Sequence, residues 1–418
     1  MRWLYTFLLY WLTPLILLRL LWRSRELPDY RRRWAERFGW VRPSPAPIAV
    51  WVHAVSVGES LAAMPLIRAL IDLHGEGAVW VTTTTPTGSA RVTETLGARV
   101  CHSYAPYDLP GSVARFLRRV RPQCVVVMET ELWPNLFHQL GAAGTPLIVA
   151  NARLSPRSMR GYSRVRGFAQ STLAAARIAA QSAADAERFR QLGAQRVTVM
   201  GNIKFDLSID EAQIRAGHDL RRRIGAQRPV WVAASTHEGE EDIALRAHAE
   251  LRRAYADALL ILVPRHPQRF DTVARRIAGS GLAMARRASG DDPAAAAVLL
   301  GDTMGEIFVY YAAADLAVVG GSFVDIGGHN VLEPASIGLP VLFGPQMHNF
   351  LPARDLLLQG QAAIGLDEPV MLVPTLHALL ADPERRARMG AAGRDAVQAN
   401  RGALQTLLGL IADPASLD

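Results

Sequence analysis

A glutamate stands where an apolar stretch gives way to a helical pattern early in the chain. Residues 48–53 are apolar and predict a buried strand, and residues 60–73 have the spacing of an amphipathic helix. Glu59 follows Gly58 between them. The helix dipole favours a charged carboxylate in the first turn. Such a carboxylate can act as a general base that removes a proton from a hydroxyl group, or it can only steady the helix. The residues alone leave both roles open.

A glycine-rich turn in the second half of the chain has the features of an anion-binding site. Residues 316–319 predict a short buried strand, and residues 331–337 predict a short helix capped by Asn330. Backbone N–H groups at such a turn point outward and can hold an anion. Glu333 could accept hydrogen bonds from sugar hydroxyls. The alternative is a tight connection that binds nothing. The glycines that permit the turn are Gly320, Gly321, Gly327 and Gly328.

Lys204 is the single lysine of the chain, and all the other side chains counted as Lys or Arg are arginines. A lysine ammonium is a compact point charge, whereas a guanidinium is a planar fork, so some sites cannot exchange the two. The alternative is that Lys204 remains a lysine by chance and has no special role. In a closed site, an ammonium could compensate a carboxylate or a departing phosphate.

Short apolar stretches alternate with helical patterns along most of the chain. This alternation predicts parallel, doubly wound sheets of the α/β class. A chain of 418 residues is too long for one ordinary core, so we expect two domains. The further expected strands are residues 78–83, 99–103, 124–128, 146–150, 177–180 and 197–200 in the first half, and 230–234, 259–263, 282–285, 298–300 and 341–343 in the second.

Polar motifs follow many of these strands, and ligands of doubly wound sheets bind outside the carboxyl ends of the strands. Two such sheets facing each other across a cleft would bring the motifs together, with Lys204 where the two halves join. Glu129 and Glu131 are equal candidates by spacing for a role in that cleft. The motifs are residues 53–60, 82–88, 128–134, 151–155, 235–241, 264–267 and the glycine-rich turn.

The N-terminus predicts a membrane anchor. Residues 3–18 carry no charge, and apolar residues continue to Trp22, which is about long enough to cross the apolar core of a bilayer. Aromatic residues stand near both ends and arginines follow, which places the body of the protein on the cytoplasmic side. Pro14 and Arg19 weaken a full span, so a helix lying in the interface and a core helix are the alternatives.

The formal net charge of +8 suits a nucleic acid, an anionic membrane or a phosphorylated substrate. Nucleic acid is the least supported partner, because the chain has no lysine-rich tail, zinc-finger spacing or RNA-binding signature. A metal site is not expected either. His237 and Glu238 lack a second histidine four residues on, and no histidine pair has ligand spacing on one helix.

Together, these motifs resemble those of the 3-deoxy-D-manno-octulosonic acid (Kdo) transferases of bacterial lipopolysaccharide synthesis. The similarity runs from end to end, beginning with the apolar N-terminus. Many long motifs in one order make this a specific signal. The motifs that carry it are residues 57–59, 129–134, 204–206, 235–241, 264–267, 301–306 and 320–350.

The resemblance implies an inverting glycosyltransferase of the GT-B fold, with two facing Rossmann-like domains. It implies CMP-Kdo as donor, the tetraacylated lipid A precursor lipid IVA as acceptor, no metal and no cofactor. It places the protein on the cytoplasmic side of the inner membrane with a single N-terminal anchor. It maps Glu59 onto the general base, and Glu129 and Lys204 onto stabilisers of the transition state. The residues it maps onto the donor site are Arg265, His266, Met304, Gly305, Glu306, Asn330, Val331, Leu332 and Glu333.

The expected domains follow from the same patterns. Residues 1–22 form the anchor, and residues 23–47 form a basic neck with a proline-rich linker. Residues 48–205 form an acceptor-binding domain, and residues 206–418 form a donor-binding domain with terminal helices. Two other classes remain. A nucleotide-sugar epimerase shares the architecture but needs no anchor, and a membrane-tethered scaffold needs no carboxylates at several strand ends.

Overall fold

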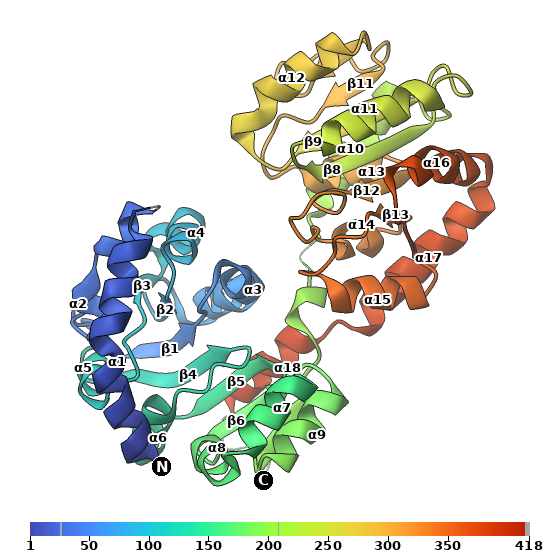
Figure 1. The fold of residues 1–418 in the computed structure, drawn as a ribbon. Helices are drawn as coiled ribbons and strands as arrows, with labels where there is room; N and C mark the ends of the chain where they lie inside the picture. Colours follow the sequence, from blue (N-terminus) through green and yellow to red (C-terminus); the bar gives the residue numbers. More distant parts are fainter. Residues whose placement is uncertain (26, 208, 414–418) are drawn as a thin grey trace. The chain divides into compact units, whose positions relative to one another are not determined.

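The computed structural model describes residues 1–25, 27–207 and 209–413 and divides into two compact units (Figure 1). Unit 1 comprises Met1–Asp206 together with the residues from Asn400 onward, and unit 2 comprises Leu207–Ala399. Each unit contains its own parallel sheet of seven strands. The expected pair of doubly wound α/β domains is therefore confirmed.

The sheet of unit 1 has the strand order β3-β2-β1-β4-β5-β6-β7, and every neighbouring pair is parallel. The order reverses between β1 and β4, which are neighbours in the sheet but not in sequence. The strands are β1 (Ile48–His53), β2 (Val79–Thr83), β3 (Cys101–Tyr104), β4 (Pro122–Met128), β5 (Leu147–Ala152), β6 (Ala176–Ala180) and β7 (Arg196–Val199). The helices between them are α3 (Val57–His74), α4 (Pro86–Leu96), α5 (Pro110–Val120), α6 (Pro134–Ala142), α7 (Pro156–Ser163), α8 (Arg166–Leu173) and α9 (Ala183–Gln191).

Unit 2 repeats the plan with the order β10-β11-β9-β8-β12-β13-β14, again all parallel. Here the order reverses between β8 and β12. The strands are β8 (Val230–Thr236), β9 (Leu259–Pro264), β10 (Met284–Arg286), β11 (Val298–Leu300), β12 (Leu316–Val319), β13 (Val341–Phe343) and β14 (Ala363–Gly365). The helices are α10 (Glu211–Ile224), α11 (Glu240–Leu251), α12 (Phe270–Gly279), α13 (Ile307–Ala313), α14 (Leu332–Ser336), α15 (Leu351–Gln359), α16 (Leu372–Ala381) and α17 (Pro383–Ala399). The three-residue edge strand β14 was not predicted from the sequence.

The inner strands of each sheet are buried on both faces, which explains why they are almost continuously apolar. In β1, Val50 and Val52 face the cluster that includes α3, whereas Trp51 faces Phe116 and Phe137 on the other side. All five of these side chains are at most 1% exposed. Burying a side chain of this size contributes about 1.5–3 kcal/mol. This packing holds the strands rigid and fixes the position of the loops at their carboxyl ends.

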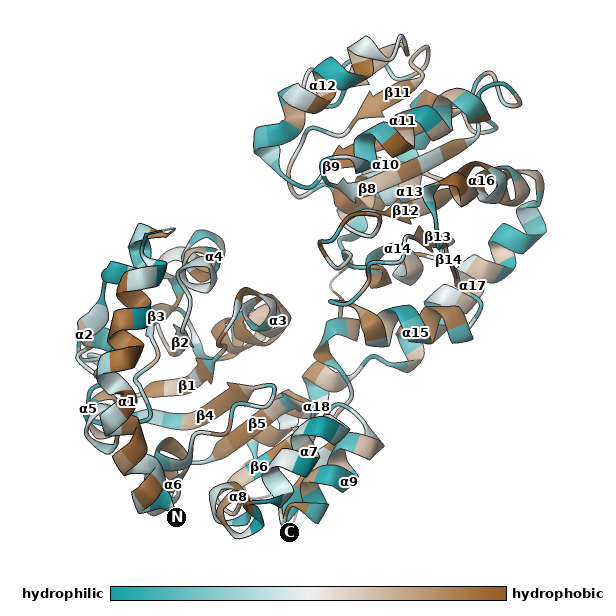
Figure 2. Ribbon diagram, in the orientation of Figure 1, coloured by the Kyte–Doolittle hydropathy of each residue, from teal (hydrophilic) through white to brown (hydrophobic). Residues whose placement is uncertain are grey.

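Helix α1 (Arg2–Arg23) lies along unit 1 beside α6 (Figure 1). It is long and apolar enough to cross a membrane, by length and composition only. Its inward stripe is held by two side-chain hydrogen bonds. The Tyr5 hydroxyl donates to Asp108 Oδ2 at 3.0 Å, and the Thr6 hydroxyl donates to Asn135 Oδ1 at 3.0 Å. The outward residues are mostly apolar (Figure 2) and include the exposed Trp3, Phe7, Trp11, Leu15, Leu18 and Trp22.

The basic stretch that the sequence analysis treated as a neck and linker packs onto unit 1. It contains the turn η1 (Pro28–Arg31) and helix α2 (Trp34–Arg37). Arg37 is 3% exposed, its guanidinium stacks on the ring of Tyr104 at 4.1 Å, and it donates to the Thr84 carbonyl. Glu36 accepts a hydrogen bond from the Tyr104 N–H. Cation–π and backbone contacts therefore fix this segment, which the charge pattern alone did not indicate.

The last helix, α18 (Ala403–Ala412), belongs to unit 1 and not to the second domain, where the sequence analysis placed the terminal helices. Leu407, Leu410 and Ile411 join the buried cluster between α3 and the sheet. Both carboxylate oxygens of Asp206 accept backbone hydrogen bonds at the start of α18, from Gly402 and Leu404 at 2.7 Å each. The chain leaves unit 1 after Asp206 and returns to it at Asn400. These hydrogen bonds therefore join the leaving and returning segments inside unit 1.

Candidate active site

Glu59 lies in the first turn of α3, after β1, at the point where the strand order of unit 1 reverses. Doubly wound sheets bind ligands at this place. Ser56 caps the helix, because its hydroxyl oxygen accepts a hydrogen bond from the Glu59 N–H at 3.3 Å. The Glu59 carboxylate accepts in return from the Val55 N–H at 2.8 Å and from the Ser56 hydroxyl at 3.0 Å. This reciprocal arrangement fixes the carboxylate and also stabilises the helix start.

Burial raises the pKa of Glu59 to about 7. The hydrogen bond from Val55 lowers the pKa, and the negative charge of Glu129 raises it. Smaller effects follow in the same pattern, with the hydrogen bond from Ser56 lowering the pKa and the negative charge of Glu131 raising it. A base works best when its pKa lies near the working pH. The site therefore gives this carboxylate the proton affinity that a general base needs at neutral pH.

Glu129 directly follows β4, the other strand at the reversal point. Its backbone has a φ of 58°, in the left-handed region, and its N–H donates to the Ala150 carbonyl at 2.8 Å. Such a conformation is uncommon for a residue other than glycine, and it often marks functional positions. The neighbouring Glu131 carboxylate accepts a hydrogen bond from the Trp133 indole at 2.9 Å. The two glutamates that spacing left equivalent therefore differ in the structure: Glu129 has the left-handed backbone, and Glu131 has an indole partner.

Lys204 follows β7 at the far edge of the sheet, and the chain then turns back over the carboxyl ends of the strands. Asn151, near the carboxyl end of β5, guides this path: its side-chain oxygen accepts the Ile203 N–H at 3.2 Å. Asn202 holds the Lys204 N–H at 3.1 Å, and the turn η3 (Ile203–Phe205) contacts both α3 and α18. Lys204 is half-buried. Glu59 and Lys204 therefore come from two segments that pack together, far apart in the sequence.

The glycine-rich turn after β12 is not an open anion site, contrary to the expectation from sequence. The buried carboxylate of Glu240 occupies it: Oε2 accepts the Gly321 N–H at 2.7 Å, and Oε1 accepts those of Ser322 and Phe323 at 3.0 Å each. Gly320 has to be a glycine here, since a Cβ would come within 2.6 Å of the Ser235 carbonyl oxygen. The protein thus supplies its own anion at this turn.

Cationic and imidazole groups gather beside that turn at the carboxyl ends of β8, β9 and β12. Arg265 follows β9, and its N–H donates to the Thr236 carbonyl at 3.0 Å. The His266 ring meets the His237 ring edge-on at 5.3 Å, and His237 Nε2 lies 2.8 Å from His329 Nε2. Burial lowers the pKa of His329 to about 3, and the positive charge of Arg265 lowers it further. Neutral imidazoles and a guanidinium are therefore arranged together at the reversal point of this sheet.

Helix α14 begins at Leu332, one residue later than expected, with Val331 and not Asn330 at its N-cap position. The Asn330 side-chain oxygen accepts the Leu332 N–H at 3.1 Å from just before the helix. Val331 and Leu332 are buried and pack into unit 2. Burial raises the pKa of Glu333 to about 7, and hydrogen bonding to Asn330 and the charge of Arg265 oppose the rise. Because the charge of Arg265 acts on both Glu333 and His329, the sequence-predicted Arg265 and Glu333 share one cluster with His329, which was not predicted.

The remaining sequence-predicted residues lie on the loop between β11 and α13. Met304 is 59% exposed, and Gly305 has a φ of 79°, which favours glycine. Glu306 is held by both the Arg287 guanidinium, at 3.0 and 3.2 Å, and the Thr303 hydroxyl, at 2.6 Å. The Glu306 carboxylate is therefore already engaged, which leaves the exposed backbone and Met304 as the groups of this loop open to a ligand.

Comparisons with known proteins identify the family. The family described as 3-deoxy-D-manno-octulosonic-acid transferase (kdotransferase) matches residues 32–207. The 3-deoxy-D-manno-octulosonic acid transferase of Haemophilus influenzae is 42% identical over 98% of this chain and 98% of its own length. The chain belongs to the Kdo transferases. The fold is GT-B: MurG of Acinetobacter baumannii matches with a TM-score of 0.56 at 14% identity, over 88% of this chain and 99% of that chain. The C-terminal CMP-Kdo binding domain of WaaA from the same organism is 33% identical over 45% of this chain and all of that domain, with a TM-score of 0.44.

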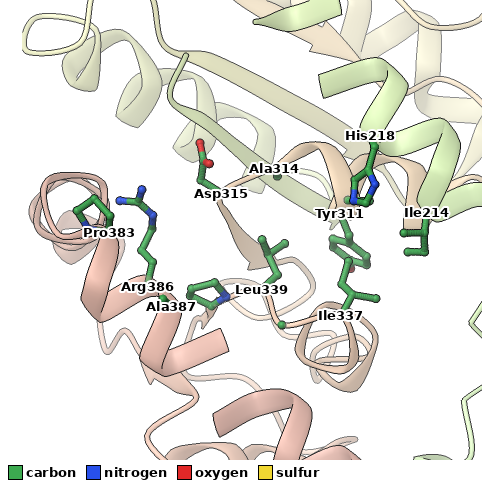
Figure 3. A pocket seen from close by; sticks show the side chains of 13 residues that line it. Ile214, His218, Tyr311, Ala314, Asp315, Ile337, Leu339, Pro383, Arg386 and Ala387 are labelled. Atoms are coloured by element: carbon green, nitrogen blue, oxygen red, sulfur yellow. The ribbon is translucent and has the colours of Figure 1, made fainter. Parts of the chain in front are cut away.

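A cavity of about 360 Å³ in unit 2 of this Kdo transferase lies away from these residues, at the amino ends of β12 and β13 (Figure 3). Asp315 at its edge is paired with Arg221 at 3.0 Å and accepts the Val230 N–H. Arg386 donates to the carbonyls of Leu379 and Leu380. The charged groups of the cavity already have partners in the protein, so it offers little to an anionic substrate.

Sequence reasoning missed three residues that shape the site of the transferase, namely His237, Glu240 and His329. The motif at 235–241 was recognised, but no role could be given to its members, because their partners lie in the loop after β12. The available signal was that His329 directly follows Gly327 and Gly328, in the turn after a predicted strand. Among the described residues, no group of three His, Cys, Asp or Glu side chains could hold a metal ion.

Proposed function

We propose that this Kdo transferase is an inverting enzyme that moves Kdo from CMP-Kdo to the lipid A precursor lipid IVA in lipopolysaccharide core synthesis, with Glu59 as general base. The observation that carries the proposal is the carboxylate of Glu59. It is buried at the reversal point of the first sheet, fixed by two hydrogen bonds, and its pKa is raised to about 7. The donor and acceptor are those that membership of this family implies.

Chemically, the carboxylate of Glu59 would take the proton of an acceptor hydroxyl group as its oxygen attacks the anomeric carbon of Kdo. The bond between that carbon and the phosphate oxygen breaks on the opposite face, and CMP leaves with the bonding electrons. A single displacement of this kind inverts the anomeric centre, as with water in inverting hydrolases. Lys204 would meet negative charge that develops during transfer, and Glu129 would help to stabilise the same transition state.

The donor site is proposed in unit 2. Arg265 can pair with a phosphate through two N–H groups, and His266 stands beside it. Asn330, Val331, Leu332 and Glu333 would contact the nucleotide from the start of α14. The loop carrying Met304, Gly305 and Glu306 would complete the site. Unit 1 would then bind the acceptor.

The apolar outward face of α1 supports attachment to the cytoplasmic side of the inner membrane. Aromatic side chains such as Trp3 and Trp22 at its two ends favour a membrane–water interface. The inward face is bonded to unit 1 through Tyr5 and Thr6. A helix held along its domain in this way would lie in the interface, because a full span would require these contacts to open.

Incubating the purified protein with CMP-Kdo, with and without lipid IVA, tests the proposal. Transfer should depend on the acceptor, with release of CMP. Acceptor-independent epimerisation of a nucleotide sugar, or no reaction at all, would contradict it. Deleting residues 1–22 should release the protein from membranes and leave CMP binding intact. A truncated protein that still sediments with membranes in high salt would contradict the anchor.

A further inference from the structure

The occupied glycine-rich turn raises the question of where unit 2 holds an anionic ligand. Glu240 accepts four backbone N–H groups, and the fourth, at 2.9 Å, belongs to His237. The same carboxylate therefore joins the loop after β8 to the loop after β12. It is 4% exposed, so these bonds are shielded from water. Glu240 closes one anion site and, in doing so, fixes the backbone position of His237.

The His329 imidazole is placed from the other side. Gly321 has a φ of 66°, and a Cβ there would come within 3.1 Å of two atoms of the His329 ring, so the ring packs directly over the glycine. The Gly328 N–H donates to the Gly321 carbonyl at 2.7 Å and closes this loop. As a result, the rings of His237 and His329 are nearly parallel, at 7°, with their centroids 5.0 Å apart.

Two imidazole Nε2 atoms 2.8 Å apart share one proton, because one ring must donate and the other must accept. The pair is half-buried, and Arg265 and Arg269 both act on His237, opposed by the Glu240 carboxylate. Arg269 is also paired with Glu241. If an oxyanion bound here, both imidazole rings could donate an N–H hydrogen bond to it, and the nearby guanidinium groups would favour its negative charge. The donor-site residues proposed for unit 2 do not include the His237–His329 pair.

We propose that His237 and His329 together bind an oxyanion of the donor substrate, either its phosphate or its sugar carboxylate, and that Glu240 is a positioning residue that holds the pair in place. This inference rests on the proposed function, since it assumes a donor with an anionic phosphate and an acidic sugar. Both groups offer the same chemistry, an oxygen that accepts two N–H hydrogen bonds.

The test measures the Kd for CMP and the KM for CMP-Kdo in the full chain. His237→Ala and His329→Ala should each raise the KM for CMP-Kdo about tenfold or more, as expected for the loss of a hydrogen bond to a charged group, with a smaller change in kcat. His329→Gln, which keeps an N–H donor, should recover part of the loss. The matched control is His218→Ala, an exposed histidine on α10 of the same unit, which should change neither constant.

The two possible oxyanions give different results. If the pair binds the phosphate, the Kd for CMP rises together with the KM for CMP-Kdo. If it binds the sugar carboxylate, the Kd for CMP stays unchanged. Glu240→Gln should raise the KM for CMP-Kdo as well, whereas Glu238→Gln, at an exposed carboxylate in the same motif, should not. Thermal melts identify variants that fail to fold.

Two outcomes would overturn the inference. A parent protein that binds CMP, with both histidine-to-alanine variants folded and within twofold of its constants, would overturn it and leave the proposed function intact. A parent protein that binds neither CMP nor CMP-Kdo would overturn the proposed function and this inference together.

Discussion

Units 1 and 2 each contain a seven-stranded parallel sheet, but different side chains gather where the strand order of each sheet reverses. At the reversal point of unit 1 stand the carboxylates Glu59 and Glu129. At that of unit 2 stand imidazoles beside Arg265. Burial shifts the pKa in both places toward the neutral form, up for Glu59 and down for His329, and like charges nearby strengthen each shift. The comparison suggests a division of tasks, with proton transfer in unit 1 and anion binding in unit 2.

The largest expected effect separates the two tasks directly. Glu59→Gln keeps the shape of the side chain and removes its basicity, so the transfer rate should fall by ~10²–10⁴. The Kd for CMP should stay near that of the parent, because CMP binding is assigned to unit 2. The matched control is Glu94→Gln, at an exposed position on α4. A Glu59→Gln variant with more than a third of the parent rate would remove Glu59 from its role.

Lys204→Arg tests whether unit 1 also needs a compact cation. The chain uses arginine at every other basic Lys or Arg position, so the fold tolerates it widely. A donor displaced by about 1 Å in a closed site can cost ~10²-fold in rate, and we expect a loss of this order with an unchanged melting temperature. A rate and a thermal melt measured on one preparation decide the question. Full activity would mean that the single lysine has no special role.

Leu407→Ala tests whether unit 1, unlike unit 2, depends on a helix from the far end of the sequence for its core. Leu407 is fully buried in the core of unit 1, so the truncation should lower the free energy of unfolding by about 2–5 kcal/mol. CMP binding at low temperature should persist, because unit 2 keeps its own core. Leu73→Ala, at a leucine of α3 that is 67% exposed, is the control. Equal melts for the two variants would argue against the role of α18 in unit 1.

The smallest expected effect concerns pH. With Glu59 as base, kcat/KM should rise with pH through about 7, where the carboxyl group loses its proton, and level off above. Glu131→Gln removes a negative charge that raises the pKa of Glu59, so this rise should move to lower pH. Glu94→Gln should leave the profile unchanged. By linkage, the raised pKa of Glu59 also means that its contribution favours folding at low pH and is lost as pH rises from about 4.5 through about 7.

The sequence was sufficient to predict the local features of this molecule. Nearly all strands and the motifs at their carboxyl ends follow from apolar periodicity and from the hydrogen-bonding capacity of single residues. The prediction of an open anion site failed because the competing carboxylate, Glu240, lies about 80 residues before the turn that it fills. The pairing of His237 with His329 and the return of α18 to unit 1 were missed for the same reason. Contacts between distant segments leave no periodic signal in the sequence.

The return of α18 has a consequence for the order in which the protein can fold during synthesis. Domains generally fold from the N-terminus as the ribosome releases them, at about 5–20 residues per second. Unit 1 departs from this order, because Leu407, Leu410 and Ile411 complete its core and are translated after all of unit 2. The apolar surface of α3 that they cover is therefore exposed on the nascent chain until α18 has been translated. Unit 2, translated without interruption, can fold first.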